Sequence, residues 1–436
     1  MQRVFFDSEF TELGVDPKLI SIGFVAEDGE RTFYAELADT YRLSDCSDFA
    51  KLAVLPLLEG GNTLMTMREL GERLTSWLTA FGEPVKLATD SLSWDWPWIK
   101  EIFYEMDAWP KNLDGYLVGE RGKGLACMFK MMNEARIAVG LGAAVLGYTS
   151  YLHALDYALN RPQGRLAAEK DPARPQVPIV EHADVRRMLL AQKSYSEGAL
   201  ALALYSARLV DEQQSAPTDE ERLRAERLLD LLTPMTKSWP SQWCLEGNSL
   251  AIQIHGGYGY TREYNVEQFY RDNRLNPIHE GTFGIQALDL LGRKIRLHDG
   301  QSMELLDARI QETTNIARAR GLLREHAEQL SASWAAVLQV VQRLYSIAEV
   351  SIRLANAGAF LEAFGHVVLA WIWLEQAIAA TKLLEECSDE SERNFSLGKL
   401  QACRFFYFWE LPKVSTWLLL LDPVEITCLE MKNEWF

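Results

Sequence analysis

The chain contains 436 residues, of which 48% are hydrophobic and 24% are charged, and its formal net charge is −17. This length exceeds what one hydrophobic core usually organises, so we expect two or three domains. The composition is that of a globular protein, and the negative charge leaves no excess of cationic surface for phosphate backbones or anionic lipids. We therefore expect neither nucleic acid nor a membrane as the main partner.

The six cysteines are scattered along the chain without a CxxC pair, which indicates reduced thiols rather than a disulfide framework or a zinc site. Residues 1–10 lack the basic and then apolar pattern of a signal sequence. The most apolar stretch, FGHVVLAWIWLEQAIAA, is interrupted by His366 and Glu375 short of a bilayer span. These features predict a cytoplasmic protein without a membrane helix.

Residues 1–115 have the periodicity of strands. The segments VFFDSEF, LISIGFVAED and RTFYAEL are rich in β-branched and aromatic residues or alternate in polarity. A further strand, VKLATDS, follows two helical patterns at about 43–57 and 65–81. This order predicts an α/β layer with a meandering sheet.

Strand signals stop near Tyr116, and helical patterns continue from there to the end of the chain. Loops are predicted at RPQGRLAAEKDPARPQVP and DEQQSAPTDEE because of their prolines and short polar residues. The chain as a whole is therefore predicted to be mainly α. The predicted helices are 123–160, 181–212, 218–262, 282–298, 303–330, 331–355, 357–387 and 396–420.

Acidic residues in the first segment suggest a metal site. Asp7 and Glu9 lie two residues apart on a predicted strand, so their side chains share one face and can hold a hard cation such as Mg²⁺ or Mn²⁺. Asp95, at the start of a predicted helix in SWDWPWI, would add a third carboxylate. FFDSEF and DWPW resemble the first motifs of DEDD-type 3'-5' exoribonucleases, which cleave phosphodiesters with two metal ions. The resemblance implies a partial ribonuclease H-like domain at 1–115 with these three residues as metal ligands.

Two features weaken the nuclease interpretation. That family has a histidine five residues ahead of its last aspartate, whereas His153 and Asp156 in YLHALDYAL are only three residues apart. Residues 1–115 also contain 21 acidic and 10 basic residues, a balance that repels a phosphate substrate. We therefore favour a truncated α/β domain with leftover acidic residues over a working nuclease.

The helical part carries long motifs of a different family. The segments MFKMMNEARIAVGLGAAVLGYTSYLHALDYALNRPQGR and QIHGGYGYTREYNVEQFYRDNRLNPIHEGTFGIQALDLLGRKI are similar to the C-terminal helical domain of acyl-CoA dehydrogenases. LEAFGHVVLAWIWLEQAIAA and the terminal GKLQACRFFYFWELPKV…MKNEWF resemble an extra helical domain of a larger-subunit subgroup that includes the methylmercaptopropionyl-CoA dehydrogenases. The resemblance implies a helical bundle at 116–300 followed by a second helical domain at 301–436.

Glu280 stands in the turn-like string His-Glu-Gly-Thr directly before an apolar helix. It can be a helix cap or a base directed into a pocket. The resemblance implies a base, because Glu280 matches the glutamate that removes the α-proton of an acyl-CoA thioester while a hydride leaves the β-carbon for FAD. Burial beside an apolar substrate strengthens a carboxylate as a base. The family usually has tyrosine where this chain has His279.

Other predicted site residues follow from the same resemblance. A glycine-rich segment lets the backbone approach a diphosphate closely, and here it would contact the ADP part of FAD held by the neighbouring subunit, which implies at least a homodimer. Arg136 matches a position near the CoA or acyl chain, with a solvated helix arginine as the alternative. The predicted FAD-binding residues are Arg161, Gln163, Gln253, Gly256, Gly257, Gly259 and, on the flavin side, Thr282.

Acyl-CoA dehydrogenases normally have an N-terminal helical domain and a middle β domain ahead of this region. Residues 1–115 take their place, so we expect an incomplete enzyme. Three explanations are compatible with this expectation: a gene fusion after deletion, a chimeric gene model, or a scaffold that uses only the surfaces of the two parts. Three functions are compatible with the sequence. They are an FAD-dependent acyl-CoA dehydrogenase that passes electrons to electron-transfer flavoprotein, a metal-dependent 3'-5' exonuclease, and a non-catalytic dimerisation module. We favour the first.

Overall fold

A computed structural model of the chain describes residues 2–12, 17–89, 91–104, 109–113, 124–169, 171 and 173–436. The chain divides into two compact units, Met1–Met128 and Phe129–Phe436. The predicted change from α/β to helical structure near residues 115 and 116 lies outside the described residues.

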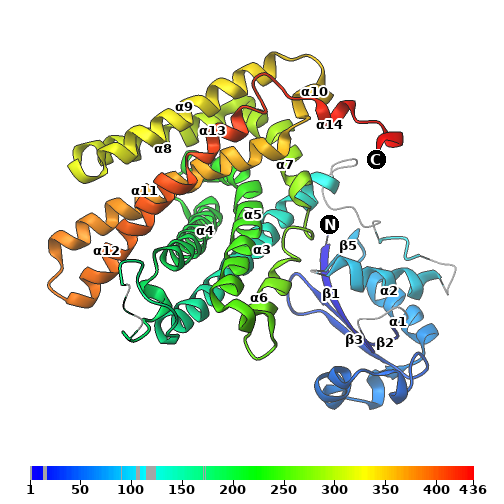
Figure 1. Ribbon diagram of the computed structural model, residues 1–436. Coiled ribbons are helices and arrows are strands. Elements are labelled where there is room, and N and C mark those ends of the chain that lie inside the picture. Colours follow the sequence, from blue (N-terminus) through cyan, green and yellow to red (C-terminus); the bar gives the residue numbers. More distant parts are fainter. Residues whose placement is uncertain are drawn as a thin grey trace. The chain divides into compact units, whose positions relative to one another are not determined.

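The N-terminal unit contains a mixed sheet of five strands in the order β4-β3-β2-β1-β5 (Figure 1). The first three strands form an antiparallel meander, as predicted, whereas β4 and β5 pair in parallel with β3 and β1. The short β4 was not predicted. The strands are β1 (Gln2–Phe10), β2 (Leu19–Ala26), β3 (Thr32–Leu37), β4 (Leu64–Met65) and β5 (Val85–Ala88).

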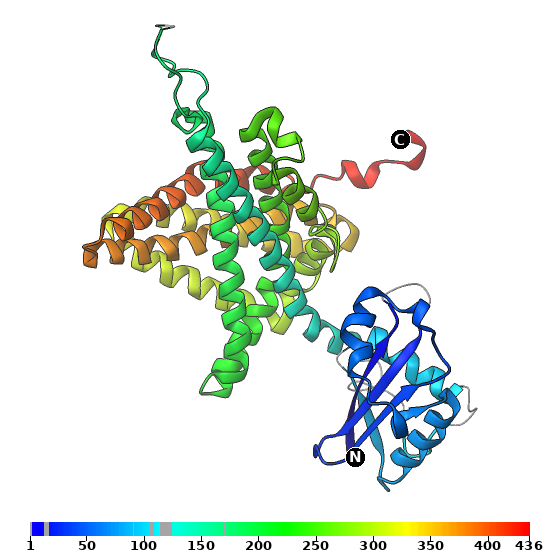
Figure 2. The same ribbon diagram turned by 90° about the horizontal axis from the view of Figure 1, so that it is seen from below.

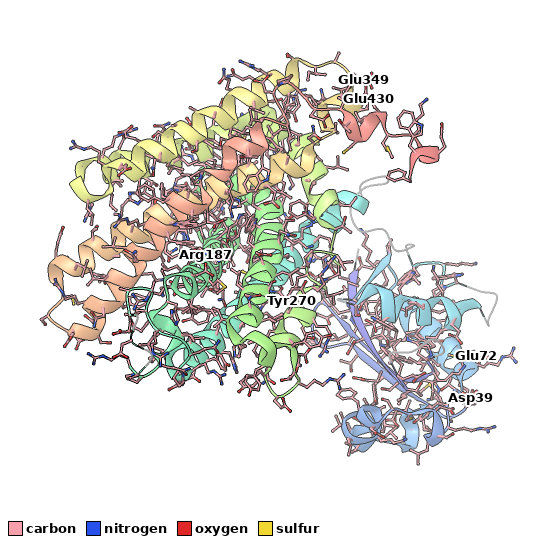
Figure 3. All side chains as sticks on the ribbon, viewed as in Figure 1. Asp39, Glu72, Arg187, Tyr270, Glu349 and Glu430 are labelled. Atoms are coloured by element: carbon pink, nitrogen blue, oxygen red, sulfur yellow. The ribbon has the colours of Figure 1, made fainter. Side chains whose placement is uncertain are left out.

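Two helices, α1 (Met67–Thr79) and α2 (Leu92–Tyr104), share a hydrophobic core with the sheet. A capping box between Thr66 and Glu69 starts α1, whose other face is polar and carries the exposed Glu72 (Figure 3). The helix predicted at 43–57 is wrong. This segment contains two 3-10 turns and one π turn, because Pro56 has no N–H to continue an α-helix.

The helical unit begins with three long helices, and shorter helices follow (Figures 1 and 2). The predicted helices at 123–160, 181–212 and 357–387 are confirmed to within three residues at each end. The pattern at 218–262 ends at His255, the helix Val266–Asn273 was not predicted, and the boundary predicted between residues 330 and 331 is wrong because it lies inside the helix Arg324–Ser346. The helices are α3 (Gly124–Asn160), α4 (Ala183–Ser215), α5 (Asp219–His255), α6 (Val266–Asn273), α7 (Phe283–Gly292), α8 (Gln301–Ala319), α9 (Arg324–Ser346), α10 (Val350–Leu354), α11 (Ala357–Glu386), α12 (Glu390–Phe405), α13 (Lys413–Leu418) and α14 (Thr427–Glu430).

Helix α3 approaches α5 at unusually short range. A Cβ on Gly140 would lie 1.9 Å from the carbonyl oxygen of Thr236, and a Cβ on Gly147 would lie 2.7 Å from Cys244 Cβ. Pro240 has no N–H, so the carbonyl of Thr236 has no donor at the i+4 position within α5. Glycine at position 140 therefore lets the backbone of α3 lie against this part of α5, directly beside Lys237.

Helix α11 is the central helix of the C-terminal region. Trp373 Nε1 donates to the carbonyl of Ser194 on α4 at 3.0 Å, and Trp239 Nε1 on α5 donates to His366 Nδ1 at 3.1 Å. By length and composition, Met132–Asn160 and Ala357–Glu386 are apolar enough to cross a membrane, with mean hydropathy of 1.3 and 1.5. The apolar window of the second is 83% buried in the protein, as expected of a core helix.

Candidate functional site

The segment between α6 and α7 forms a left-handed bend at the predicted base. Glu280 has φ of 53° and Gly281 has φ of 88°. Thr282 is the N-cap of α7, and its hydroxyl accepts a hydrogen bond from the Ile285 N–H at 3.4 Å. The alternative that Glu280 caps this helix is therefore wrong, because the cap lies two residues later.

Two buried side chains hold this bend through its backbone. Lys237, which is 0% exposed, donates from Nζ to the carbonyls of Asn276 at 2.7 Å and Gly281 at 2.8 Å. Gln286, also 0% exposed, donates from Nε2 to the carbonyl of Glu280 at 3.1 Å. A Cβ on Gly281 would lie 2.5 Å from that Nε2 atom. The half-buried Glu280 is thus fixed at its main chain from both sides.

Charged groups surround Lys237. Burial and then the positive charge of Arg136 lower the pKa of Lys237 to about 8, against the opposing effect of the negative charge of Glu280. Arg136, which is 3% exposed, forms an ion pair with Asp289 on α7 at 3.2 Å. The alternative that Arg136 is a solvated helix arginine is therefore wrong. Its predicted contact with substrate stays a prediction.

Three buried asparagines connect the bend to α3 and α5. Asn276 Nδ2 donates to Asn273 Oδ1 at 2.8 Å, and Asn273 Nδ2 donates to Asn248 Oδ1 at 2.6 Å. Asn248 and Asn273 also donate to the carbonyls of Leu146 and Ala143 on α3, at 3.2 and 3.3 Å. Satisfied buried networks of this kind rigidify their surroundings.

His279 occupies the position where the family usually has tyrosine. Its Nδ1 lies 3.0 Å from the carbonyl oxygen of Leu275, one turn earlier. The imidazole therefore interacts with the end of α6. The N–H of His279 donates to the same carbonyl at 3.2 Å.

The predicted nucleotide-binding segments come together at the C-terminal end of α5. The guanidinium of Arg161 lies over the ring of Tyr258 at 5.5 Å, and Tyr157 stacks on His255 with ring centroids 4.3 Å apart. A Cβ on Gly259 would lie 2.6 Å from the carbonyl oxygen of Ile252, so this glycine is required for the turn to pack. The structure thus brings the end of α3 to the glycine-rich segment.

The same end of α5 has features that fit the diphosphate and adenosine part of FAD. Arg161 Nε is buried without a hydrogen-bond partner among the described residues. An added Cβ on Gly256 or Gly257 would meet nothing within 4 Å, which leaves open space beside their backbone. Gln253 is exposed, and Gln163, also exposed, is placed by its main chain, whose N–H donates to Val177 at 2.9 Å. A cation and an accessible backbone are suitable for an anionic group.

The predicted base and the predicted FAD-binding turn do not form one site within this chain. Gln253 lies sixteen residues after Lys237 on α5, which places the two about 24 Å apart along the helix axis. Arg161 and the glycine-rich turn form one cluster, whereas Glu280, Lys237 and Gln286 form the other. This separation is compatible with the predicted arrangement in which the turn serves a neighbouring subunit.

The predicted metal site of the N-terminal unit does not form among the described residues. Asp7 and Glu9 share the exposed face of β1 as predicted, and burial and then the charges of Asp7 and Asp95 raise the pKa of Glu9. Asp95, however, is 1% exposed and accepts hydrogen bonds from the hydroxyls of Ser8 and Thr89. Because neighbouring residues of a strand point to opposite faces, Ser8 holds Asp95 on the other face.

A further cavity of about 370 Å³ lies between α4, α5 and the C-terminal helices. Arg187 on α4 lines it (Figure 3), and so do Trp243 and Glu410. Trp243 Nε1 donates to Glu362 at 2.8 Å, and Lys413 lies over the Trp243 ring at 4.6 Å and pairs with Glu410. This cavity contains none of the predicted site residues.

Sequence reasoning missed Lys237, Gln286 and Asp289. One signal for Lys237 was present, because it is the single charged residue in the apolar stretch LLTPMTKSWPSQWCL. A lone cation in a buried helical segment indicates a specific partner. Its partners are backbone carbonyls, which no residue pattern reveals.

Comparison with known proteins identifies the helical part. Residues 122–295 match the family model of the acyl-CoA dehydrogenase C-terminal domain, and residues 306–432 match the model described as acetyl-CoA dehydrogenase C-terminal like. Among curated relatives, the 3-methylmercaptopropionyl-CoA dehydrogenase of Ruegeria pomeroyi is 37% identical over 64% of this chain and 47% of its own length. The broad-specificity linear acyl-CoA dehydrogenase FadE5 of Mycobacterium tuberculosis is 31% identical over 74% of this chain and 54% of its own length.

Solved structures show the same fold. An acyl-CoA dehydrogenase of Bacillus anthracis complexed with FAD aligns with a TM-score of 0.53 at 19% identity, over 69% of this chain and 51% of that one. ACDH-11 of Caenorhabditis elegans, in complex with C11-CoA, aligns with a TM-score of 0.52 at 16% identity, over 72% and 51%. The chain thus spans about half the length of the relatives that it matches. Through its two C-terminal helical domains, the chain belongs to the acyl-CoA dehydrogenase family.

Proposed function

We propose that this protein acts in the α,β-dehydrogenation of an acyl-CoA thioester, with Glu280 as the base. The observation that carries the proposal is the left-handed bend at Glu280 and Gly281, fixed by Lys237 and Gln286 and followed immediately by the capped start of α7. A carboxylate held by its backbone keeps its position when a substrate binds, and proton transfer depends on that geometry.

The residues of the chain have separate tasks in this reaction. Glu280 would accept the proton from the α-carbon of the thioester. Lys237 and Gln286 hold the backbone on both sides of the base, and the Arg136–Asp289 ion pair joins α3 to α7 behind it. FAD would accept the hydride from the β-carbon, and its ADP part would be held by Arg161 with the turn at Gly256 and Gly257, where the structure provides a cation and accessible backbone.

The finer assignments also belong to this proposal. The separation of about 24 Å between Lys237 and Gln253 along α5 supports a homodimer in which FAD is held between subunits. The 37% identity to a 3-methylmercaptopropionyl-CoA dehydrogenase supports placement in that subgroup. Electron-transfer flavoprotein is the proposed electron acceptor. The described cysteines are free thiols, which supports a cytoplasmic location. We propose domains at 1–115, 116–300 and 301–436.

The first experiment is the visible spectrum of the purified chain, before and after addition of FAD. About one flavin per chain, bleached by an acyl-CoA, is the expected result. A colourless dimer that binds no added FAD would contradict the proposal and favour a non-catalytic dimerisation module. A yellow protein that no acyl-CoA bleaches would support FAD as the cofactor and contradict the proposed reaction.

The second experiment replaces the base. Glu280→Gln keeps the size of the side chain and removes its proton affinity, so bleaching by acyl-CoA is expected to slow by about 10²-fold or more, while bound FAD is retained. Glu304→Gln, an exposed glutamate at the start of α8, is the matched control and is expected to bleach at the unsubstituted rate. Equal rates for Glu280→Gln and the control would remove Glu280 from the mechanism.

No described feature favours the nuclease. Asp95 lies on the opposite face of β1 from Asp7 and Glu9, and its oxygens accept hydrogen bonds from two hydroxyls. We retain a ribonuclease H-like origin of the five-stranded sheet only as a proposal about ancestry. The exonuclease activity itself is not proposed.

A further inference from the structure

We infer that Lys237 is the positioning residue for the base: its ammonium holds the bend that carries Glu280 in its left-handed conformation and supplies the positive charge under it. The inference rests on the proposed function. It concerns a side chain that no motif of the sequence singled out.

The geometry of Lys237 is that of a clamp. Its Nζ bonds to two carbonyls that lie on either side of Glu280 in the sequence, Asn276 at 2.7 Å and Gly281 at 2.8 Å. Bonds from a charged donor are stronger than neutral ones. Because Glu280 has a positive φ, which costs free energy for a residue with a Cβ, the bend needs such outside support. Gln286 adds a third bond, to the carbonyl of Glu280 itself at 3.1 Å.

The position of Lys237 on α5 is also fixed. Gly140 on α3 lies directly against Thr236 and Lys237, and an added Cβ there would lie 3.3 Å from Lys237 Cα. The backbone of α3 therefore covers the base of the lysine side chain. An ammonium attached to so rigid a helix can determine where the bend lies.

The charge of Lys237 is not neutralised by an ion pair. Among the described carboxylates, none lies within 4 Å of its Nζ. The charged groups that act on it are Arg136 on α3, which pairs with Asp289 on α7, and Glu280 in the bend. The lysine ammonium and the Glu280 carboxylate therefore attract each other across the bend.

This arrangement predicts a pH effect that a purely structural lysine would not produce. Burial lowers the pKa of Lys237 to about 8, so the ammonium loses a proton in a range that enzyme assays reach. A neutral amine still has two N–H donors and can keep both carbonyls. Above pH 8 the bend is therefore expected to persist without the positive charge beside Glu280, and the rate of flavin bleaching is expected to rise with an apparent pKa near 8.

The test uses three variants of the full chain. Lys237→Met removes the charge at similar length, Lys237→Arg keeps the charge with a different donor geometry, and Lys399→Met is the control. Lys399 pairs with Glu197 at 2.7 Å on α12 and α4, in another part of the helical unit. The readouts are amide hydrogen exchange of residues 274–286, and the pH profile of bleaching by acyl-CoA.

Lys237→Met is expected to speed exchange of residues 274–286 by about tenfold or more, because two charge-assisted hydrogen bonds are lost. It should also lower the bleaching rate at pH 7 more than it changes substrate affinity, and abolish the rise near pH 8. Lys237→Arg should restore part of the protection without restoring that rise. Lys399→Met should behave as the unsubstituted protein in both measurements.

Two outcomes would overturn the inference: unchanged exchange of residues 274–286 in Lys237→Met, or the same changes in Lys399→Met. If Lys237→Met does not fold, Lys237→Arg decides, and unchanged exchange of residues 274–286 together with an unchanged pH profile in that variant would overturn the inference. Hydrogen exchange requires no turnover. If no acyl-CoA bleaches the flavin, the proposed function fails. Faster exchange in Lys237→Met would still support the role of Lys237 in holding the bend.

Discussion

The two units of this protein each present carboxylates that match a catalytic motif, and their surroundings differ. Glu280 lies in a bend whose backbone is held by a buried lysine and a buried amide. In the N-terminal unit, β1 separates Asp7 and Glu9 from Asp95, which is held by two hydroxyls. The difference shows that acidic residues at a motif's spacing form a common site only when buried partners place them together.

The comparison depends first on the contact between α3 and α5 that places Lys237. Gly140→Ala would put a methyl group 1.9 Å from the carbonyl oxygen of Thr236, a backbone atom that no rotamer change can move. We expect a loss of unfolding free energy of about 3 kcal/mol or more, measured by urea denaturation. Gly142→Ala, in the same helix with nothing within 4 Å of its added methyl group, should be neutral or slightly stabilising. Equal stability of the two variants would contradict the close packing.

The bend itself can be tested with a second glycine pair. Gly281→Ala introduces a side chain at φ of 88°, within 2.5 Å of the Gln286 amide nitrogen. We expect it to cost about 1–3 kcal/mol and to slow bleaching by acyl-CoA, because the bend must open. Gly284→Ala, in the first turn of α7 with open space around it, is the control for both measurements. Retained activity in Gly281→Ala would show that the base tolerates another backbone conformation.

The smallest expected effects concern the sheet. Asp95→Ala removes the acceptor of two hydroxyls, one of them from the buried Ser8, and should destabilise residues 1–128 by about 1–3 kcal/mol. Asp7→Ala, on the exposed face, should change stability by less than about 0.5 kcal/mol. Calorimetry in the presence and absence of Mg²⁺ measures both. A rise of several degrees with millimolar Mg²⁺, lost in Asp7→Ala, would restore the metal-site hypothesis.

Periodicity predicted much of the fold. The meander of β1 to β3 and the long helices follow directly from residue patterns, because alternation and the 3.6-residue repeat reflect burial. The segment 43–57 was predicted as one helix and contains short turns, since apolar spacing alone gave no weight to Pro56. The two-residue β4 is too short to carry a pattern. Helix α6 was not predicted, and α5 was extended to residue 262 because the break at Gly256 was read only as a diphosphate loop.

The site was predicted less completely than the fold. Glu280 and the glycine-rich turn were identified by resemblance, and the sequence left a cap at Glu280 open as the alternative without identifying Thr282 as the cap. Lys237 was missed because its partners are carbonyls brought close only by the crossing of α3, α5 and the bend. Arg136 illustrates the same limit. Its burial depends on Asp289, 153 residues later in the chain.

The packing around helix α11 has a consequence for how the helical region can be divided. One continuous apolar cluster includes side chains from α3, α4, α5, α8, α9, α11 and α12, so residues far apart in the gene exclude water jointly. Truncation at residue 300 would leave Trp239 without the His366 and Phe406 rings that pack against it, and such a fragment should precipitate. Separation of these helices would expose apolar surface on both pieces, so the helical region of this chain is expected to fold as one unit.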